Sequence, residues 1–255
     1  RHDDYVRQPV PEQIVVHGFL FSRGEERSKS VGNGVEPTDL VRTYGGDQTR
    51  YFFLREVPFG QDGNYSHEAI VNRINADLAN DLGNLAQRSL SMIAKNCGGK
   101  VPAQGPRTEA DAAILAQAAE LPEKARAAMK DFALHHVLGD IWRVVAEANR
   151  YFASEEPWKL TKTDPARRDD WGRQRQFFTD RRDAVLYVTA EVLRRVAIMT
   201  QPVMPASMAK LLDILGVAAD ARDFAAADDA HALQSGADLP PPAPIFPRYV
   251  EAEEG

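Results

Sequence analysis

The sequence predicts a mainly α-helical protein in which a short strand-and-loop segment precedes an all-α bundle. Apolar residues recur at helical spacing in successive blocks from Ser66 to Gly216. One apolar run, residues 14–21, is instead bounded by polar and turn residues, as is typical of a buried strand. Proline and glycine clusters separate the helical blocks by short loops, which favours a bundle of about five helices.

The composition is that of an ordinary globular protein. The 255 residues are 44% hydrophobic and 27% charged, which allows a sizeable core. The net charge of −6 argues against a non-specific nucleic-acid coat but leaves a local basic face possible. A single cysteine, Cys97, excludes an intramolecular disulfide and a cysteine-rich zinc site. Without an apolar run of ~20 residues or a signal-peptide pattern, we expect a cytoplasmic protein with no membrane partner.

The apolar run leads into a polar loop, residues 24–33, that carries Ser28, Lys29 and Ser30 between glycines. Glycines let backbone N–H groups approach an anion, while the lysine supplies a compact positive charge and the serines supply hydroxyl donors. These features suit a phosphate-handling loop. On composition alone a solvated surface turn is the stronger interpretation.

Two short elements are expected after the loop. A helix begins at Pro37, with Thr38 as its cap, and ends at Gly45. Residues 47–54 form a second piece, helical or extended. Residues 59–64 have strong turn chemistry, so we expect a domain junction at about residues 58–66.

Ser66 is expected to cap a long helix of about 27 residues that Gly98 and Gly99 end. Its apolar stripe is Ile70, Ile74, Leu78, Leu82, Leu85 and Ile93. Further helices are expected at residues 108–119, 121–134, 136–152, 173–200 and 206–215.

These elements divide the chain into three parts. Residues 1–60 are the end of a preceding domain, residues 61–239 the helical domain, and residues 240–255 a proline-rich tail. Ile245 and Phe246 are expected to dock back onto the body, because an isolated apolar pair in a tail would otherwise lie in water.

Three residues of the helical domain are candidates for nucleic-acid contact. Asn84 and Arg88 are four apart and so share one face of the long helix, and both residue types contact base edges and phosphates. Trp158 follows Pro157 at a helix break, where an aromatic ring can stack on an unpaired base. From the residues alone, exposed side chains beside a core stripe and a tryptophan plugging the core are the stronger interpretations.

Other clusters carry less. The pairs Arg167-Arg168 and Arg181-Arg182 are interspersed with aspartates, so we expect a solvated charged face rather than an RNA contact. His135 and His136 point about 100° apart on a helix and lack partners at ligand spacing, so no metal site is expected. No serine- or cysteine-hydrolase pattern occurs.

The polar loop and its surroundings resemble the methionyl-tRNA synthetases of bacteria, which are class I aminoacyl-tRNA synthetases. Residues 24–33 are similar to the second signature loop of that class, Lys-Met-Ser-Lys-Ser. Ser28 to Ser30 match, whereas Glu26 and Arg27 stand where the family has lysine and methionine. His17-Gly18 before the loop and residues 55–63 after it also match.

The resemblance implies a fold and a set of site residues. The fold would be the last strand and signature loop of a Rossmann-like α/β catalytic domain, followed by an all-α anticodon-binding bundle. Lys29, with Ser28 and Ser30, would stabilise the triphosphate of ATP, and His17-Gly18 would lie beside ATP.

The anticodon readers of the family match residues of the bundle. The pattern Asn-Leu-Ala-x-Arg corresponds to Asn84 through Arg88, and a Pro-Trp pair corresponds to Pro157-Trp158. The family's tRNA would then be recognised by Asn84, Arg88 and Trp158.

The first class I signature, His-Ile-Gly-His, does not occur. The chain therefore resembles only the C-terminal half of a methionyl-tRNA synthetase. The resemblance implies a monomer, and it implies that the complete enzyme uses ATP with Mg²⁺, methionine and tRNA(Met). Alone it is expected to bind tRNA but not to form methionyl adenylate. The alternatives are a stand-alone, non-catalytic tRNA-binding module, which Glu26 and Arg27 favour slightly, and a helical scaffold.

Overall fold

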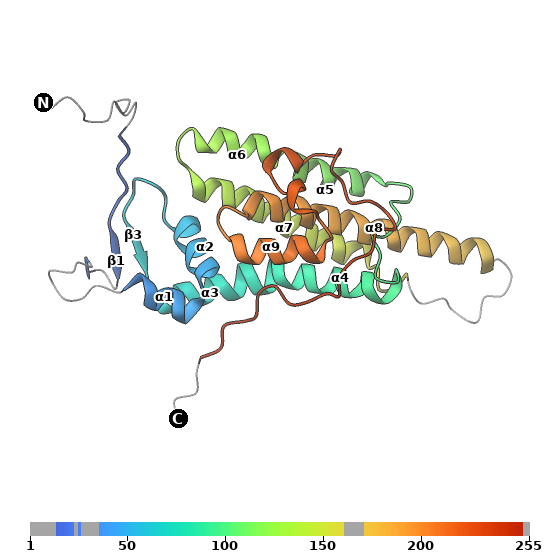
Figure 1. Ribbon diagram of the computed structural model, residues 1–255, viewed down its shortest axis with the longest axis horizontal. Coiled ribbons are helices and arrows are strands. Elements are labelled where there is room, and N and C mark those ends of the chain that lie inside the picture. Colours follow the sequence, from blue (N-terminus) through green and yellow to red (C-terminus); the bar gives the residue numbers. More distant parts are fainter. Residues whose placement is uncertain (1–13, 23–24, 27–35, 161–170, 252–255) are drawn as a thin grey trace, which may run out of the picture.

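The computed structural model describes residues 14–22, 25–26, 36–160 and 171–251, and the statements below concern these residues. A small sheet and two short helices lie at one end of an elongated helical bundle, and the chain after the last helix runs back along the bundle (Figure 1). The predicted class, a mainly helical protein with a short strand-and-loop segment before the bundle, is confirmed. None of the described helices is both long and apolar enough to cross a membrane.

The sheet has three short strands in the order β2-β1-β3. β1 (Leu20–Ser22) pairs antiparallel with β2 (Glu25–Glu26) and parallel with β3 (Gly63–Tyr65). β3 follows the turn expected at residues 59–64 and was not predicted. The turn is held on the sheet because the Gly63 N–H donates to the Phe19 carbonyl over 2.8 Å.

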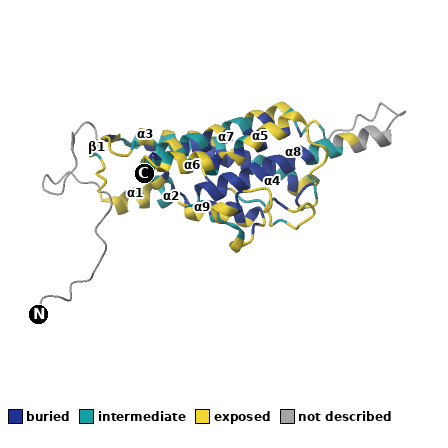
Figure 2. Ribbon diagram, turned by 90° about the horizontal axis from the view of Figure 1, so that it is seen from above, coloured by how far each residue is buried: buried dark blue, intermediate teal, exposed yellow. Residues whose placement is uncertain are grey.

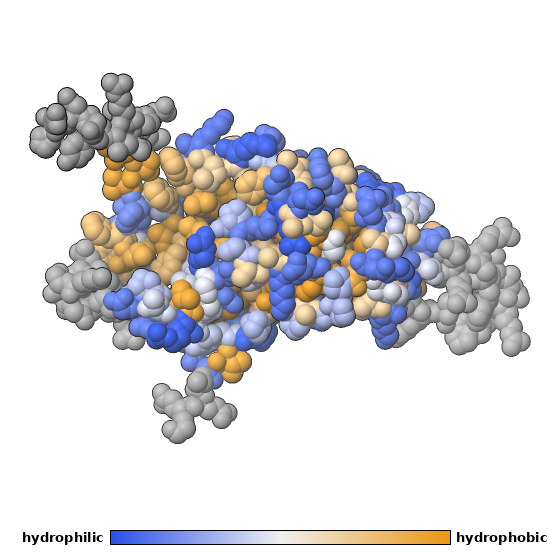
Figure 3. Space-filling model, viewed as in Figure 1, coloured by the Kyte–Doolittle hydropathy of each residue, from blue (hydrophilic) through white to orange (hydrophobic). Residues whose placement is uncertain are grey.

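The expectation of a buried strand over residues 13–21 is wrong. Only Leu20 to Ser22 are in a strand, and the side chains of Ile14, Val16 and Phe19 are 86%, 75% and 63% exposed. A strand of a parallel sheet is normally covered on both faces. In the described residues no layer covers this segment, and apolar side chains gather at that end of the surface (Figure 3).

α1 (Pro37–Tyr44) and α2 (Gly46–Glu56) connect the sheet to the bundle. Glu36, not Thr38, occupies the N-cap of α1, because Pro37 with its fixed φ and missing N–H fits the first helical position. Gly45 ends α1 with φ of 94°, as expected. Residues 47–54, left open between helix and strand, are helical.

The predicted long helix is confirmed, but its middle is not an α-helix. α3 (His67–Arg73) continues through η2 (Ile74–Gly83), a π-helix of ten residues, into α4 (Asn84–Asn96). Ser66 caps the start as predicted, since its hydroxyl accepts from the Ala69 N–H.

The other bundle helices lie close to the predicted ranges. They are α5 (Glu109–Ala119), α6 (Leu121–Met129), α7 (Leu134–Glu155), α8 (Trp171–Thr200) and α9 (Pro205–Ile214). Thr108 and Asp111 form a reciprocal capping box on α5. α6 ends five residues earlier than expected, because the chain turns through Phe132 at φ of 54°.

α8 is the centre of the core. It packs against α4, α5, α7 and α9, and its residues from Ala184 to Met199 are buried on every side (Figure 2). This buried stretch of α8 includes charged residues, because Glu191 pairs with Arg194 and Arg195. Glu191 also accepts the Leu233 N–H, which ties the loop after α9 to α8.

The tail docks as predicted. After the short turns η3 (Ala219–Ala221) and η4 (Phe224–Ala226), the chain runs back to η2, and Ile245 and Phe246 are buried there. Asn75 fixes the tail by bonding both backbone groups of Tyr249.

Candidate nucleic-acid interface

Arg88 and Trp158 are brought together by the fold. The Arg88 guanidinium carbon lies 5.1 Å from the ring centroid of Phe152 and 5.4 Å from that of Trp158. In the described part of the chain, no carboxylate lies within ion-pair distance of Arg88. Its charge is therefore positioned by aromatic faces, which attract a cation electrostatically, and is not neutralised by a described carboxylate.

Asn84 lies one helical turn before Arg88 and is exposed. It is the first residue of α4, so its direction depends on how η2 ends. Arg88 is half-buried, and its guanidinium lies over the ring of Phe152 near the end of α7. The two side chains share a face of the helix, as the four-residue spacing predicted.

The break after α7 positions Trp158. Glu156 takes the left-handed conformation with φ of 45°, Pro157 is buried, and the Lys159 N–H closes the turn onto the Glu156 carbonyl over 2.8 Å. Trp158 is half-buried, with its ring centroid 5.9 Å from that of Phe152. It thus packs against the core while part of it stays exposed, which combines the two interpretations of this residue.

The expectation of a solvated face at Arg181-Arg182 is wrong. Arg181 bonds Asp111 and Glu155, with a shortest distance of 2.5 Å to Asp111, and Tyr151 also donates to Asp111. Burial would raise the pKa of Asp111, but the bonds from Arg181 and Tyr151 hold it below its usual value. These charges connect α5, α7 and α8. Arg167-Arg168 lies outside the described residues.

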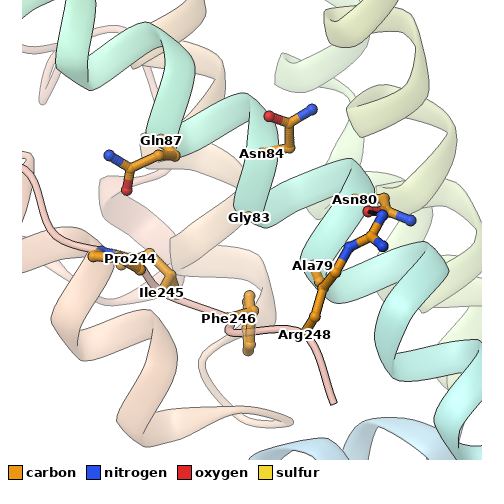
Figure 4. Close-up of a pocket in the computed structure, with 9 residues that line it drawn as sticks. All are labelled: Ala79, Asn80, Gly83, Asn84, Gln87, Pro244, Ile245, Phe246 and Arg248. Carbon is orange, nitrogen blue, oxygen red and sulfur yellow. Dashed lines mark hydrogen bonds between the residues drawn. The ribbon is translucent and has the colours of Figure 1, made fainter. Parts of the chain in front are cut away.

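A groove of about 370 Å³ lies beside Asn84, between the helix and the tail. Asn80 and Arg248 point toward each other across it and are joined by a 2.7 Å hydrogen bond, while Asn84 points away from the tail (Figure 4). Gln87 also lines it, and its Oε1 is buried without a hydrogen bond among the described residues. Sequence reasoning did not find this groove, because the tail that forms one wall is distant in the sequence.

η2 was also missed, because the spacing of its buried residues does not distinguish it from an α-helix. Ile70, Ile74, Leu78 and Leu82 are all buried at a strict spacing of four. Leu85, Ser89 and Ile93 of α4 are buried at the same spacing, so this spacing is compatible with either type of helix.

The residues that the resemblance places beside ATP are described only in part. Lys29, Ser28 and Ser30 lie outside the described residues. His17 is exposed, and its Nδ1 lies 2.8 Å from the Gly18 carbonyl oxygen. A Cβ on Gly18 would lie 2.1 Å from the Gln61 carbonyl oxygen, so only glycine allows this close approach to the turn. Among the described residues, no cluster of three His, Cys, Asp or Glu side chains could hold a metal ion.

Comparison with known proteins identifies the family. Residues 4–90 match the family model of class I tRNA synthetases (M), and residues 101–254 match that of the anticodon binding domain of methionyl tRNA ligase. The chain belongs to the methionyl-tRNA synthetase family. It corresponds to part of a methionine–tRNA ligase, namely the end of the class I catalytic domain and the anticodon-binding domain.

Individual relatives agree. The methionine–tRNA ligase of Brucella suis is 64% identical over 246 residues, which are 96% of this chain and 45% of that protein. The enzyme of Mesorhizobium japonicum is 58% identical, over 95% of this chain and 44% of that protein. The chain thus spans less than half the length of these relatives.

Solved structures show the same architecture. The apo methionyl-tRNA synthetase of Mycobacterium tuberculosis aligns with a TM-score of 0.84 and 48% identity, over 95% of this chain and 45% of that one. Its complex with methionyl-adenylate gives 0.83 and 52%, over 91% and 43%. The class I resemblance and the anticodon-binding bundle are therefore confirmed, while the roles of single residues stay predictions.

Proposed function

We propose that this chain recognises the anticodon of tRNA(Met) through Asn84, Arg88 and Trp158. In the complete enzyme it would serve the ligation of methionine to that tRNA, driven by ATP with Mg²⁺. The observation that carries the proposal is the Arg88 guanidinium between the rings of Phe152 and Trp158, with no described carboxylate in ion-pair range. A solvated charge would need no such aromatic support.

The arrangement suits a single-stranded loop. An unpaired base can stack on the exposed part of Trp158, which is worth ~1–3 kcal/mol per base. Asn84 and Arg88 then offer amide and guanidinium groups to the edge of the same base. Stacking tolerates any base, so discrimination between bases would come from the two helix residues.

The nucleotide loop is the second part of the proposal. Lys29, with Ser28 and Ser30, would stabilise the triphosphate of ATP by positioned charge, and His17-Gly18 would lie beside ATP. Its support is the sequence match of residues 4–90 to class I tRNA synthetases. Because Glu26 replaces a positive charge of the signature loop, the attraction for ATP would be weaker, and Arg27 would partly restore it.

The chain spans 45% of the matched relatives, so activation of methionine would require the remainder of the enzyme. By itself the chain would act as a tRNA-binding unit. A stand-alone binding module and a helical scaffold are the alternatives, and they differ in whether the anticodon is read.

The decisive experiment is binding of the purified chain to an RNA hairpin with anticodon CAU, compared with a hairpin in which one anticodon base is changed. The salt concentration is fixed, since phosphate contacts alone shift affinity by orders of magnitude. We expect CAU to bind about 5- to 150-fold more tightly, as ~1–3 kcal/mol per base contact implies, and Trp158→Ala to abolish tight binding.

Phe224→Ala is the matched control, because Phe224 is a half-exposed aromatic on η4 and lines neither the Arg88 site nor the groove. This variant should bind like the unaltered chain. Equal binding of both hairpins would refute anticodon recognition and favour the scaffold.

A further inference from the structure

The step from η2 to α4 decides where Asn84 points. The helix changes type between η2, which ends at Gly83, and α4, which begins at Asn84. The backbone N–H of Asn84 bonds to the carbonyl of Ala79, five residues earlier, and also to that of Asp81. Asn84 is therefore the residue at which the π register changes into the α register.

Gly83 fits this register and no larger residue does. A Cβ at Gly83 would lie 2.7 Å from the carbonyl oxygen of Leu78, a backbone atom five residues earlier, and 3.5 Å from the Cβ of Phe246. The absence of a side chain at Gly83 thus allows the wide turn directly before Asn84.

Two side chains of α7 bond the carbonyl groups of the π-helix. The Trp142 Nε1–H donates to the Asp77 carbonyl, and the Asn149 Nδ2–H donates to the Asp81 carbonyl, each over 3.3 Å. Trp142 and Asn149 are seven residues apart, so both lie on one face of α7. The Asp81 carbonyl accepts from Asn149 and from the Asn84 N–H, which connects α7 to Asn84 through a single oxygen atom.

Asp77, near the start of η2, is held by a hydroxyl group and by a guanidinium group. Asp77 accepts from Tyr51 over 2.6 Å and from Arg73 over 3.1 Å. Burial, followed by the negative charge of Asp77, raises the pKa of Asp81. The π segment is thus held on the side of α7 and α2, while its opposite side faces the tail.

We propose that Asn149 and Trp142 are positioning residues for base recognition: they hold the π register of η2 and so aim Asn84 and Arg88. The proposal rests on the function proposed above, in which those two side chains read the anticodon. Neither Asn149 nor Trp142 needs to touch RNA, because each acts through a carbonyl oxygen of η2. A π turn that served packing alone would not couple these donors to base discrimination.

The test is hairpin binding by Asn149→Leu, which keeps the size of the side chain and removes the donor. We expect the ratio of affinities for the CAU and base-changed hairpins to fall by about tenfold, within the range for one base contact. Asn149→His offers an N–H near the same place and should restore most of the ratio. Trp142→Phe, which keeps a ring without its donor, should lower the ratio in the same direction.

The control is Asn96→Leu. Asn96 donates from Nδ2 to the Met92 carbonyl of its own helix over 2.8 Å, as Asn149 does to the Val145 carbonyl over 3.1 Å, but it lies at the far end of α4 and has no such bond to η2. Its variant should change the ratio by less than about twofold at a similar melting temperature. If Asn149→Leu keeps the full ratio, or if Asn96→Leu loses as much, the positioning proposal is overturned.

Hydrogen exchange of the Asn84 amide separates this proposal from the proposed function. We expect faster exchange in Asn149→Leu than in Asn96→Leu, because α7 no longer holds in place the Asp81 carbonyl to which the Asn84 N–H bonds. If the unaltered chain does not distinguish the hairpins, anticodon reading fails. The register inference is then supported by selective loss of Asn84 protection, and it is overturned if protection is unchanged.

Discussion

The two ends of the molecule treat the same residue types differently. At the sheet end, Ile14 is 86% exposed and the ion pair of Asp39 with Arg42 lies in solvent. In the bundle, Ile198 is fully buried, and so is the ion pair of Glu191 with Arg194. Since burial sets the energetic weight of an interaction, the bundle stabilises the described fold and the sheet end contributes little. The difference teaches that the described residues from Ile14 to Ser22 have no covered core of their own, whereas Tyr51 and Phe52 of α2 are buried in the core of the bundle.

The largest effect is expected from the buried charges. Glu191→Gln should destabilise the chain by about 3–5 kcal/mol, because Arg194 would stay buried without a carboxylate partner and Arg195 would keep only Asp229. Asp39→Asn breaks a pair of the same i, i+3 spacing, but in solvent, and should cost less than about 1 kcal/mol. Urea unfolding of both variants measures the contrast, and similar losses would contradict it.

A somewhat smaller effect is expected from apolar truncation. Ile198→Ala should cost about 2–5 kcal/mol, since it leaves a cavity beside the most buried helix. Ile14→Ala, the same substitution at the sheet end, should stay within about 0.5 kcal/mol. Thermal unfolding followed by circular dichroism compares them. A large loss in Ile14→Ala would show that the sheet end has a core of its own.

The smallest effect is expected from replacing glycine by alanine in two helical segments of the bundle, Gly139 in α7 and Gly83 in η2. The two substitutions should change the stability in opposite directions. Alanine normally favours a helix by about 1 kcal/mol over glycine. Gly139→Ala on α7 has open space around the new methyl group and should stabilise the chain by up to that amount. Gly83→Ala should destabilise it instead, because the methyl group meets the Leu78 carbonyl at 2.7 Å. Equal gains in melting temperature would contradict a π-helical turn at Gly83.

Much of the bundle could be predicted from the sequence, because its signals are local. Ser66 and Thr108 stand directly before their helices, and each cap forms within three residues. The docking of Ile245 and Phe246 followed from the cost of leaving them in water. The pairing of Arg181 with Asp111 could not be predicted, since the partners are 70 residues apart and appear in the sequence as separate surface charges.

The residues of the candidate site were named from the sequence, but the contacts that position them were not predicted. Asn84 and Arg88 follow from their spacing, and Trp158 from its place at a helix break. Their roles came from resemblance, and no geometric argument reached them. The π-helix that ends at Gly83, directly before Asn84, was not predicted, because the four-residue spacing of the core stripe also fits an α-helix. The signature-loop residues Ser28 to Ser30 lie outside the described part of the chain.

The docking of the tail has a consequence for the order of assembly during synthesis. Residues Asn75 and Tyr249 bond directly although 174 residues separate them, and Asn80 meets Arg248 across 168. A ribosome adds about 5–20 residues per second, and chains begin to fold from the N-terminal side. The long helix therefore emerges about ten seconds or more before the segment that lines the groove beside Asn84. Until then Gly83 and its neighbours face water, so this surface is completed among the last of the fold.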